Sequence, residues 1–310
     1  MQLLTSIESL SSVPGPVHLA IGFFDGVHAG HQEVINHARR AAAETGGAAV
    51  AATFDPHPLK FLRPDKAPRL LTSTRHKALI MERLGISHLL VITFDGEMAA
   101  LEPDEFISRI AAACRPLASI TVGKSWAFGR GRTGTLTTLR TLGERFGFTA
   151  HGIAPVTYGS EPVSSTRIRT FVERGDFAEA ASLLARDYSI LGTVIEGRKL
   201  GRKLGFPTAN LALEAEQLPP IGVYAVRALV RDRLLPGVAN LGLRPTVDDA
   251  GTTRHFEVHL FDFTGDLYGE TMEVRFVQRL REELRFENLE QLKAQIERDS
   301  ARARAVLAVA

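Results

Sequence analysis

Short apolar runs alternate with longer amphipathic segments over the first half of this 310-residue chain. Each run has the length of a buried strand, and each segment has the spacing of a helix that covers one face of a sheet. The predicted strands are VHLAIG (17–22), GAAVAATF (47–54), HLLVITF (88–94), SITVG (119–123) and TAHGIAPV (149–156). The predicted helices span 30–45, 73–84, 103–114 and 135–146. This alternation predicts an α/β domain built on a parallel, Rossmann-like sheet.

The pattern changes after a further helical stretch at 164–186. Short alternating strands follow, among them GVYAVRALV (222–230) and RHFEVHLFDF (254–263), and turn residues separate them. The last 24 residues, 287–310, have the spacing of one amphipathic helix. We therefore predict two domains, 1–186 and 187–310, of which the second is an antiparallel β-barrel with a terminal helix.

Composition limits the kinds of molecule with which this protein is expected to interact. Lys and Arg total 37 against 35 acidic residues, a net charge of +2, which does not favour a nucleic-acid-binding protein. The single cysteine, Cys114, lies in an apolar helical pattern and is expected to be a buried thiol. No basic leader or apolar run long enough to span a bilayer is evident. We expect a cytoplasmic monomer or weak homo-oligomer that acts on small molecules, away from membranes.

The stretch GFFDGVHAGH (22–31) directly follows the first long predicted strand. Ligands of parallel sheets bind beyond the carboxyl ends of the strands, where a helix N-terminus also favours phosphate. His28 and His31 can each donate a ring N–H to charge that develops on phosphorus. Two alternatives are that one histidine caps the helix while the other packs, or that a metal binds. The metal set would be Asp25, His28, His31, Asp55 and His57.

This stretch resembles the GxFDGxHxGH signature of nucleotidylyltransferases. TFDPHP (53–58) and VSSTRIR (163–169) are similar to signatures of the FMN adenylyltransferase half of bacterial bifunctional FAD synthetases. Hydroxyl residues at a helix start are also caps and phosphate donors, and an arginine can grip pyrophosphate. The resemblance implies that the nucleotide and its phosphates are bound by Gly22, Phe23, Asp25, Gly30, Asp55, His57, Ser164, Ser165, Thr166 and Arg167.

The segment VGKSWAFGRGRTG (122–134) departs from that family. The family usually carries Asp or Asn where this chain has Ser125, followed by Trp126. Ser125 can hydrogen-bond ribose or phosphate, but it supplies no charge. Trp126 and Phe128 are candidates for stacking on adenine or flavin, with packing in the core as the alternative.

A glycine-rich basic stretch opens the second domain, in LGTVIEGRKLGRKLGFPTANL (191–211). Its candidate phosphate-binding residues are Gly197, Arg198, Gly201, Arg202, Lys203 and Gly205, although a plain basic hairpin is the alternative. GFPTAN resembles the PTAN motif of riboflavin kinases, which implies that Thr208 and Asn210 hold Mg²⁺ against ATP. Phosphorylation of an alcohol also requires a base, and Glu257 of FEVHL matches the base of that family.

The resemblance covers almost the whole chain and implies a bacterial bifunctional riboflavin kinase/FMN adenylyltransferase. Such an enzyme converts riboflavin to FMN and FMN to FAD, with ATP and Mg²⁺ in both steps. Three alternatives stay open at this point. They are a nucleotidylyltransferase of the cytidylyl or pantetheine type, a flavin-binding regulator without catalysis, and a nucleic-acid-binding module that uses the basic loop.

Overall fold

The computed structural model describes residues 1–197, 201, 204–214, 217–245 and 252–309. The chain forms two compact units, residues 1–69 with 74–165, and residues 70–73 with 166–310. The division near residue 166 falls before the predicted boundary at 186/187 and groups the helices of 165–184 with the barrel. The assignment of separate activities to 1–186 and 187–310 stays a prediction.

The first unit contains a six-stranded sheet of order β1-β4-β3-β2-β5-β6, in which every pair is parallel. This confirms the predicted α/β class, because the five predicted strands are β2 to β6. The sequence prediction missed β1, a three-residue edge strand with one buried side chain. The strands are β1 (Gln2–Leu4), β2 (Val17–Ile21), β3 (Ala48–Asp55), β4 (His88–Thr93), β5 (Leu117–Gly123) and β6 (Thr149–Ile153).

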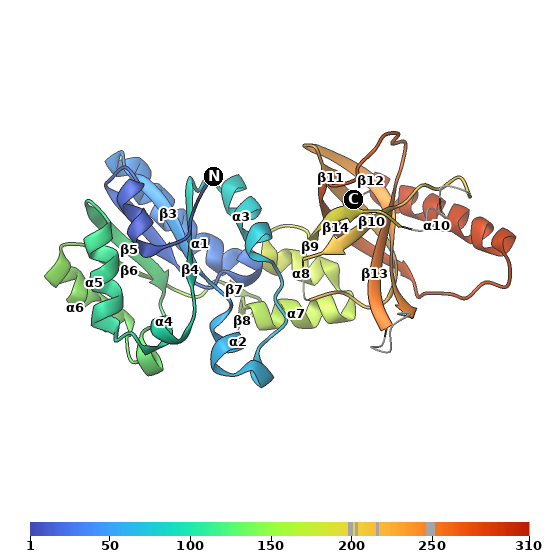
Figure 1. The fold of residues 1–310 in the computed structure, drawn as a ribbon. Helices are drawn as coiled ribbons and strands as arrows, with labels where there is room; N and C mark the ends of the chain where they lie inside the picture. The colour runs from blue at the N-terminus through green and yellow to red at the C-terminus, as the bar shows by residue number, and fades with distance from the viewer. Residues whose placement is uncertain (198–200, 202–203, 215–216, 246–251, 310) are drawn as a thin grey trace. The chain divides into compact units, whose positions relative to one another are not determined.

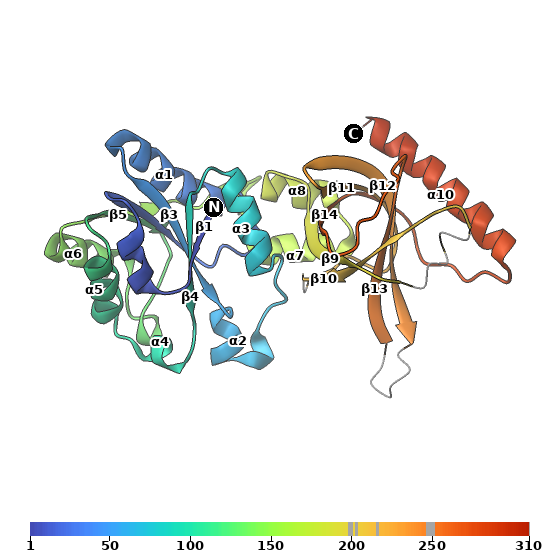
Figure 2. The ribbon, with the colours of Figure 1, turned by 45° about the horizontal axis from the view of Figure 1, so that its top comes forward.

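Helices cover both faces of this sheet (Figures 1 and 2). On one face, α1 (Ala29–Thr45) and α3 (Thr74–Arg83) enclose an apolar core with the strands. On the other, η1 (Ile7–Ser12), α5 (Pro103–Ala113) and α6 (Leu136–Phe146) enclose a second core. The remaining elements are η2 (Asp25–Val27), α2 (Pro58–Leu62), η3 (Pro64–Lys66), α4 (Gly96–Ala100), η4 (Arg130–Arg132), β7 (Thr157–Tyr158) and β8 (Glu161–Pro162).

The second unit is a closed barrel of order β10-β13-β12-β11-β14-β9, as predicted. Its strands are β9 (Ser189–Ile195), β10 (Ala209–Leu213), β11 (Gly222–Val230), β12 (Arg233–Pro245), β13 (Thr252–Leu260) and β14 (Thr271–Arg281). The terminal helix α10 (Leu289–Val309) packs on β11, β12 and β14. The predicted helical stretch 164–186 is two helices, α7 (Ser165–Arg174) and α8 (Phe177–Leu184), because Gly175 at φ 79° ends the first.

Two further sequence expectations concern single features. Cys114 is buried, as predicted, and burial raises the pKa of its thiol to about 12. Over the ranges that the structure describes, no helix combines the length and hydropathy needed to cross a membrane.

Three histidines lie close together in the first unit. His18 contacts Ser119 Oγ through Nδ1 and Thr45 Oγ1 through Nε2, both at 2.8 Å. The His37 ring lies 4.5 Å from the ring of His151. Burial lowers the pKa of all three below the usual 6.5, and the histidines also lower one another's pKa in part. Arg40 and Arg140 act in the same direction, whereas Glu44 raises the pKa of His18 and His37.

These shifts predict acid sensitivity of the first unit. The unfolded chain binds more protons than the folded one once the pH falls below about 6.5, so stability is complete above that pH and declines below it. We expect the urea midpoint to drop between pH 7 and 5 and the drop to be smaller in His37→Gln. Equal drops in both proteins would contradict this assignment, and urea melts at the two pH values provide the measurement.

Candidate functional site

The first candidate site, here called the histidine site, is the turn after β2 together with His28 and His31. His28 is the N-cap of α1, and its Nδ1 accepts a hydrogen bond from the His31 backbone N–H at 3.3 Å. This assigns the proton of a neutral His28 to Nε2. The side chain is only 6% exposed. His28 therefore caps the start of α1 through Nδ1, and Nε2 carries the ring N–H.

The two imidazoles stack on each other, with ring centroids 3.5 Å apart and planes 18° from parallel. α1 begins at Ala29, one residue before the predicted start. His31 lies in its first turn, where free backbone N–H groups and the helix dipole favour an anion. The structure thus brings His28 and His31 together at the N-terminus of α1. Capping by His28 does not conflict with the proposed role of the pair as donors.

Two residues of the other signatures, His57 and Ser165, contact this turn. Asp55 ends β3, and its Oδ2 accepts a hydrogen bond from Thr74 Oγ1 at 2.8 Å. The His57 ring lies 5.0 Å from that of Phe23. Ser165 Oγ donates to the backbone oxygen of Asp25 at 3.0 Å. Thr166 and Arg167 follow Ser165 in the first turn of α7, and Ser164 directly precedes that helix.

The aromatic candidates differ in their surroundings. Phe128 belongs to the core of the first unit and is 6% exposed, whereas Trp126 is half-buried. Their rings stack with centroids 4.5 Å apart. Trp126 is therefore the more accessible of the two, and Ser125 beside it is exposed. Contact of either ring with a flavin stays a prediction.

The second candidate site, here called the barrel site, consists of Thr208, Asn210 and Glu257. Asn210 of β10 lies directly opposite Glu257 of β13, and Asn240 of β12 lies opposite Glu257 on its other side. Residues paired in this way point to the same face of a sheet. Thr208 Oγ1 lies 3.4 Å from Glu257 Oε2. Asn240 was not among the residues predicted from the sequence, although it stands in the stretch GVANLGL.

Two glycines approach the barrel site closely. A Cβ on Gly197 would lie 2.2 Å from Asn210 Nδ2, and one on Gly201 would lie 2.3 Å from the backbone oxygen of Phe206. Gly205 has φ 91°, in the region that favours glycine. Larger residues at these positions would displace their neighbours. The predicted contacts of Arg198, Arg202 and Lys203 lie outside the described residues.

Two cavities meet at Thr208. The larger, of about 400 Å³, contains all three barrel-site residues and Asn240. The smaller, of about 270 Å³, lies between β9, β10, β13 and the segment 263–268. The larger cavity has apolar walls that sequence motifs did not indicate, formed by Leu204, Phe206, Leu284, Phe286, Leu292 and Ile296.

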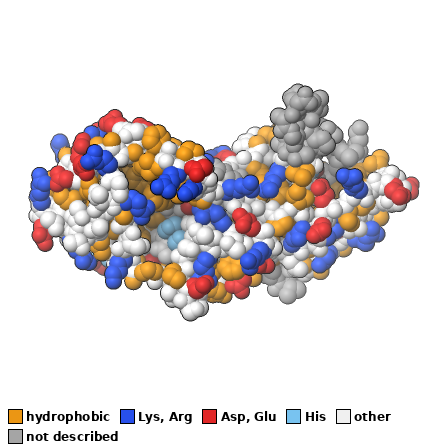
Figure 3. Space-filling model, turned by 90° about the horizontal axis from the view of Figure 1, so that it is seen from below, with side chains coloured by type: hydrophobic (Ala, Val, Ile, Leu, Met, Phe, Trp, Pro, Cys, Tyr) orange, Lys and Arg blue, Asp and Glu red, His pale blue; other side chains and the backbone are white. Residues whose placement is uncertain are grey.

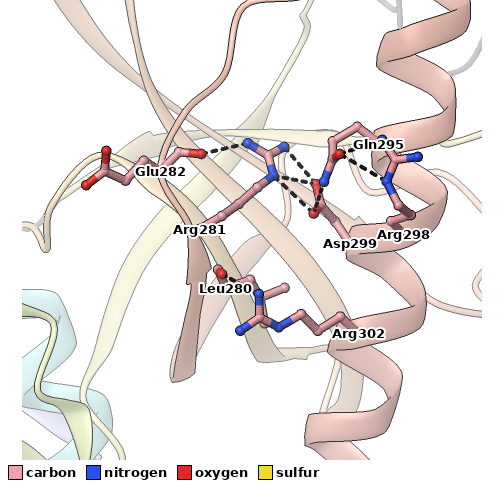
Figure 4. Close-up of polar contacts among 7 residues, drawn as sticks. All are labelled: Leu280, Arg281, Glu282, Gln295, Arg298, Asp299 and Arg302. Carbon is pink, nitrogen blue, oxygen red and sulfur yellow. Dashed lines mark hydrogen bonds and ion pairs between the residues drawn. The ribbon is translucent and has the colours of Figure 1, made fainter.

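An ion pair closes one wall of the larger cavity. Arg281 of β14 donates to both carboxylate oxygens of Asp299 in α10, at 2.7 to 3.0 Å (Figure 4). Gln295 Nε2 donates to the same carboxylate at 2.8 Å. Arg302 of α10 donates to the backbone oxygen of Leu280 at 2.7 Å. These contacts hold α10 against β14 beside the cavity.

Charge on the surface is mixed. On the face drawn in Figure 3, Lys and Arg side chains are interspersed with Asp and Glu, and histidine side chains are visible at the surface of the first unit. Among the described residues, no three His, Cys, Asp or Glu side chains are grouped so as to hold a metal ion. The barrel site offers a different donor set, because Thr208 and Asn210 carry neutral oxygens.

Comparison with known families matches both units. Residues 11–167 match the family model described as FAD synthetase, and residues 184–307 match the one described as riboflavin kinase. A bifunctional riboflavin kinase/FMN adenylyltransferase of Escherichia coli is 39% identical over 98% of this chain and 97% of its own. One of Bacillus subtilis is 37% identical over 92% of this chain and 90% of its own.

A solved structure is similar over nearly the whole chain. It is a Streptococcus pneumoniae protein described as a macrolide-efflux protein, 29% identical, with a TM-score of 0.80 over 98% of this chain and 99% of its own. The likeness supports the architecture described above.

Proposed function

This chain belongs to the family of bifunctional riboflavin kinase/FMN adenylyltransferases, and from that membership we propose how its two candidate sites divide the two reactions. The chain makes FAD in two steps. ATP first phosphorylates riboflavin to FMN, and a second ATP then adenylylates FMN with release of pyrophosphate. We assign the first step to the barrel site and the second to the histidine site. The observation that carries this assignment is that the two histidines lie in the stretch that matches the FAD synthetase model, whereas the barrel site lies in the stretch that matches the riboflavin kinase model.

Adenylyl transfer at the histidine site needs no general base. The phosphate of FMN is already ionised at neutral pH, so one of its oxygens attacks the α-phosphorus of ATP as pyrophosphate leaves. The reaction instead needs alignment and donors for the charge on phosphorus. The ring N–H of His28 at Nε2 is proposed to serve as such a donor, together with His31. The hydroxyl and arginine residues at the start of α7 are proposed to hold the phosphates.

Phosphoryl transfer at the barrel site does need a base. The riboflavin hydroxyl attacks the γ-phosphorus of ATP, its proton passes to Glu257, and ADP leaves. Glu257 lies between Asn210 and Asn240 on neighbouring strands, which fix its position at the cavity. The half-buried carboxylate is also within 3.4 Å of the Thr208 hydroxyl.

The donor chemistry of the barrel site fits Mg²⁺. Thr208 and Asn210 offer hard oxygen ligands, and glycine at position 197 leaves room for the Asn210 side chain. When bound, Mg²⁺ would neutralise phosphate charge. We propose that Thr208 and Asn210 hold it and that Glu257 keeps its role as base.

The two cavities suit the two substrates of the kinase. An apolar cavity of about 400 Å³ that contains Glu257 suits the flavin ring system. The smaller cavity shares Thr208 with it and suits the nucleotide. Thr208 then lies where the γ-phosphate must meet the hydroxyl that it phosphorylates.

We also infer that the protein works in the cytoplasm on small molecules, as a monomer or weak homo-oligomer, and not on nucleic acid. A single buried thiol and a net charge of +2 support this inference.

The direct test is to incubate the purified chain with riboflavin, ATP and Mg²⁺ and to separate the flavins by chromatography. FMN and then FAD are the expected products, and supplied FMN must yield FAD without riboflavin. A folded chain that binds flavin but consumes no ATP would contradict the proposed sites and favour a regulator.

Loss of the Asp299 carboxylate should weaken the second unit. The Asp299 side chain is 8% exposed and that of Arg281 is 19% exposed, so Asp299→Ala leaves a largely buried guanidinium without its partner. We expect a loss of about 3 kcal/mol in unfolding free energy and slower riboflavin phosphorylation. FMN adenylylation should persist where the first unit stays folded. The matched control is Lys293→Ala, an exposed residue of the same helix, and denaturant melts with separate assays of both steps provide the measurement.

A further inference from the structure

The turn that carries the histidine site has an unusual backbone. Phe24, Gly26 and Val27 have φ values of 50°, 76° and 41°. Phe24 and the β-branched Val27 are disfavoured in that region, at a cost of about 1–3 kcal/mol each, so their surroundings must hold them in place. Both side chains are fully buried, which supplies part of that restraint.

Side chains from four other segments hold the carbonyl groups of this turn. Their contacts are Thr53 Oγ1 at 3.0 Å and Lys77 Nζ at 3.3 Å on the Phe23 oxygen, Ser165 Oγ at 3.0 Å on the Asp25 oxygen, and Gln32 Nε2 at 2.9 Å on the Val27 oxygen. Three of these four donors are neutral. Lys77 is the charged one, and no sequence motif pointed to it.

Lys77 is buried to an extent that is rare for its residue type. Its side chain is 3% exposed, in α3 on the same face of the sheet as α1. A buried ammonium is costly unless anions offset it, and one backbone carbonyl is a weak offset. Burial lowers the pKa of Lys77, and the charges of Asp25 and Asp55 raise it. Those two carboxylates belong to the first and second nucleotide-binding signatures.

α3 contacts both signatures through residues three positions apart. Thr74 donates to Asp55 after β3, and Lys77 donates to the Phe23 carbonyl after β2. Residues at this spacing lie on the same face of a helix. One helix face therefore connects two loops that both follow strands of the sheet.

We propose that Lys77 is a positioning residue for adenylyl transfer. Its ammonium offsets the charges of Asp25 and Asp55 and fixes the Phe23 carbonyl, so that ATP can bind near two carboxylates. This rests on the proposed function of the histidine site. A triphosphate approaching uncompensated carboxylates meets repulsion, and the lysine removes it without contacting the substrate.

The test compares Lys77→Met and Lys77→Gln in the full chain. Gln keeps a donor for the Phe23 carbonyl but carries no charge, so both variants should raise the KM for ATP in FAD formation by about tenfold or more. Riboflavin phosphorylation by the same samples should be unchanged and serves as the folding control. Lys66→Met, an exposed lysine of the same unit, is the matched control and should behave as wild type.

A second measurement separates charge from packing. In an Asp55→Asn background one carboxylate charge is absent, so Lys77→Gln should cost at least fivefold less in ATP KM than it does in the wild-type background. Equal losses in both backgrounds, or a wild-type KM in Lys77→Gln, would overturn the proposal. Loss of both activities together in the two Lys77 variants would also overturn it, because Lys77 would then be needed for folding. If the wild-type chain makes no FAD from FMN, the proposed function fails instead.

Discussion

Replacement of His28 with alanine is expected to lower FAD formation from FMN by about 10² or more and to leave riboflavin phosphorylation intact. We assign the donor role to Nε2 of His28, because Nδ1 accepts a hydrogen bond from the His31 backbone N–H. Removing a preorganised donor of this kind affects the transition state more than the ground state, so kcat should fall more than the KM for ATP rises. Steady-state assays of each step, with riboflavin or FMN as the supplied flavin, measure both effects.

His28→Asn is the matched control, because alanine also removes the helix cap. The cap is worth about 1 kcal/mol, and asparagine is a favourable N-cap residue. We expect His28→Asn to keep the stability of the wild-type first unit and to lose adenylylation as His28→Ala does. Recovery of FAD formation in His28→Asn would show that the imidazole is not required, and the role assigned to His28 Nε2 would then be wrong.

Much of the fold was predictable because apolar periodicity marks buried elements directly. The segment predicted at 73–84 is the helix Thr74–Arg83, and the one at 103–114 is Pro103–Ala113. β1 escaped prediction because three residues with one buried side chain show no period. The sequence does contain a signal for the break between α7 and α8 that was not used in predicting one helical stretch. Gly175 is typical of a helix end, and Asp176 is typical of the start of a new helix.

Motifs located the site residues that lie close together in the sequence, but they did not reveal supports from elsewhere. His28 and Asn210 stand in recognisable stretches, whereas Lys77 lies in a helix where a lysine normally indicates a solvated face. The burial of Lys77 depends on the packing of α3 beside the turn after β2. The periodicity of apolar residues does not determine that packing. Arg281 and Asp299 are 18 residues apart, and only the docking of α10 on β14 brings them together.

Glu257→Gln is expected to reduce riboflavin phosphorylation by about 10² to 10⁴ while FAD formation from supplied FMN continues. Glutamine keeps the size of the side chain and its place between Asn210 and Asn240, but it cannot accept the proton of the riboflavin hydroxyl. The KM for riboflavin should therefore change little, and the loss should appear in kcat. Initial rates of FMN formation over a range of riboflavin concentrations measure the two constants separately.

The matched control is Asp262→Asn. This substitution removes a carboxylate that follows the end of β13 but does not belong to the barrel site. Asp262 pairs with Arg304 at the surface, and surface pairs of this kind contribute at most about 1 kcal/mol. Its φ of 55° suits asparagine. Wild-type kinase rates are expected for this variant. If Glu257→Gln retained more than about a tenth of the wild-type kcat, the proton would have to leave by another route. The Glu257 carboxylate would then not be the base. Its role would be to hold Thr208, from whose hydroxyl it accepts a hydrogen bond at 3.4 Å.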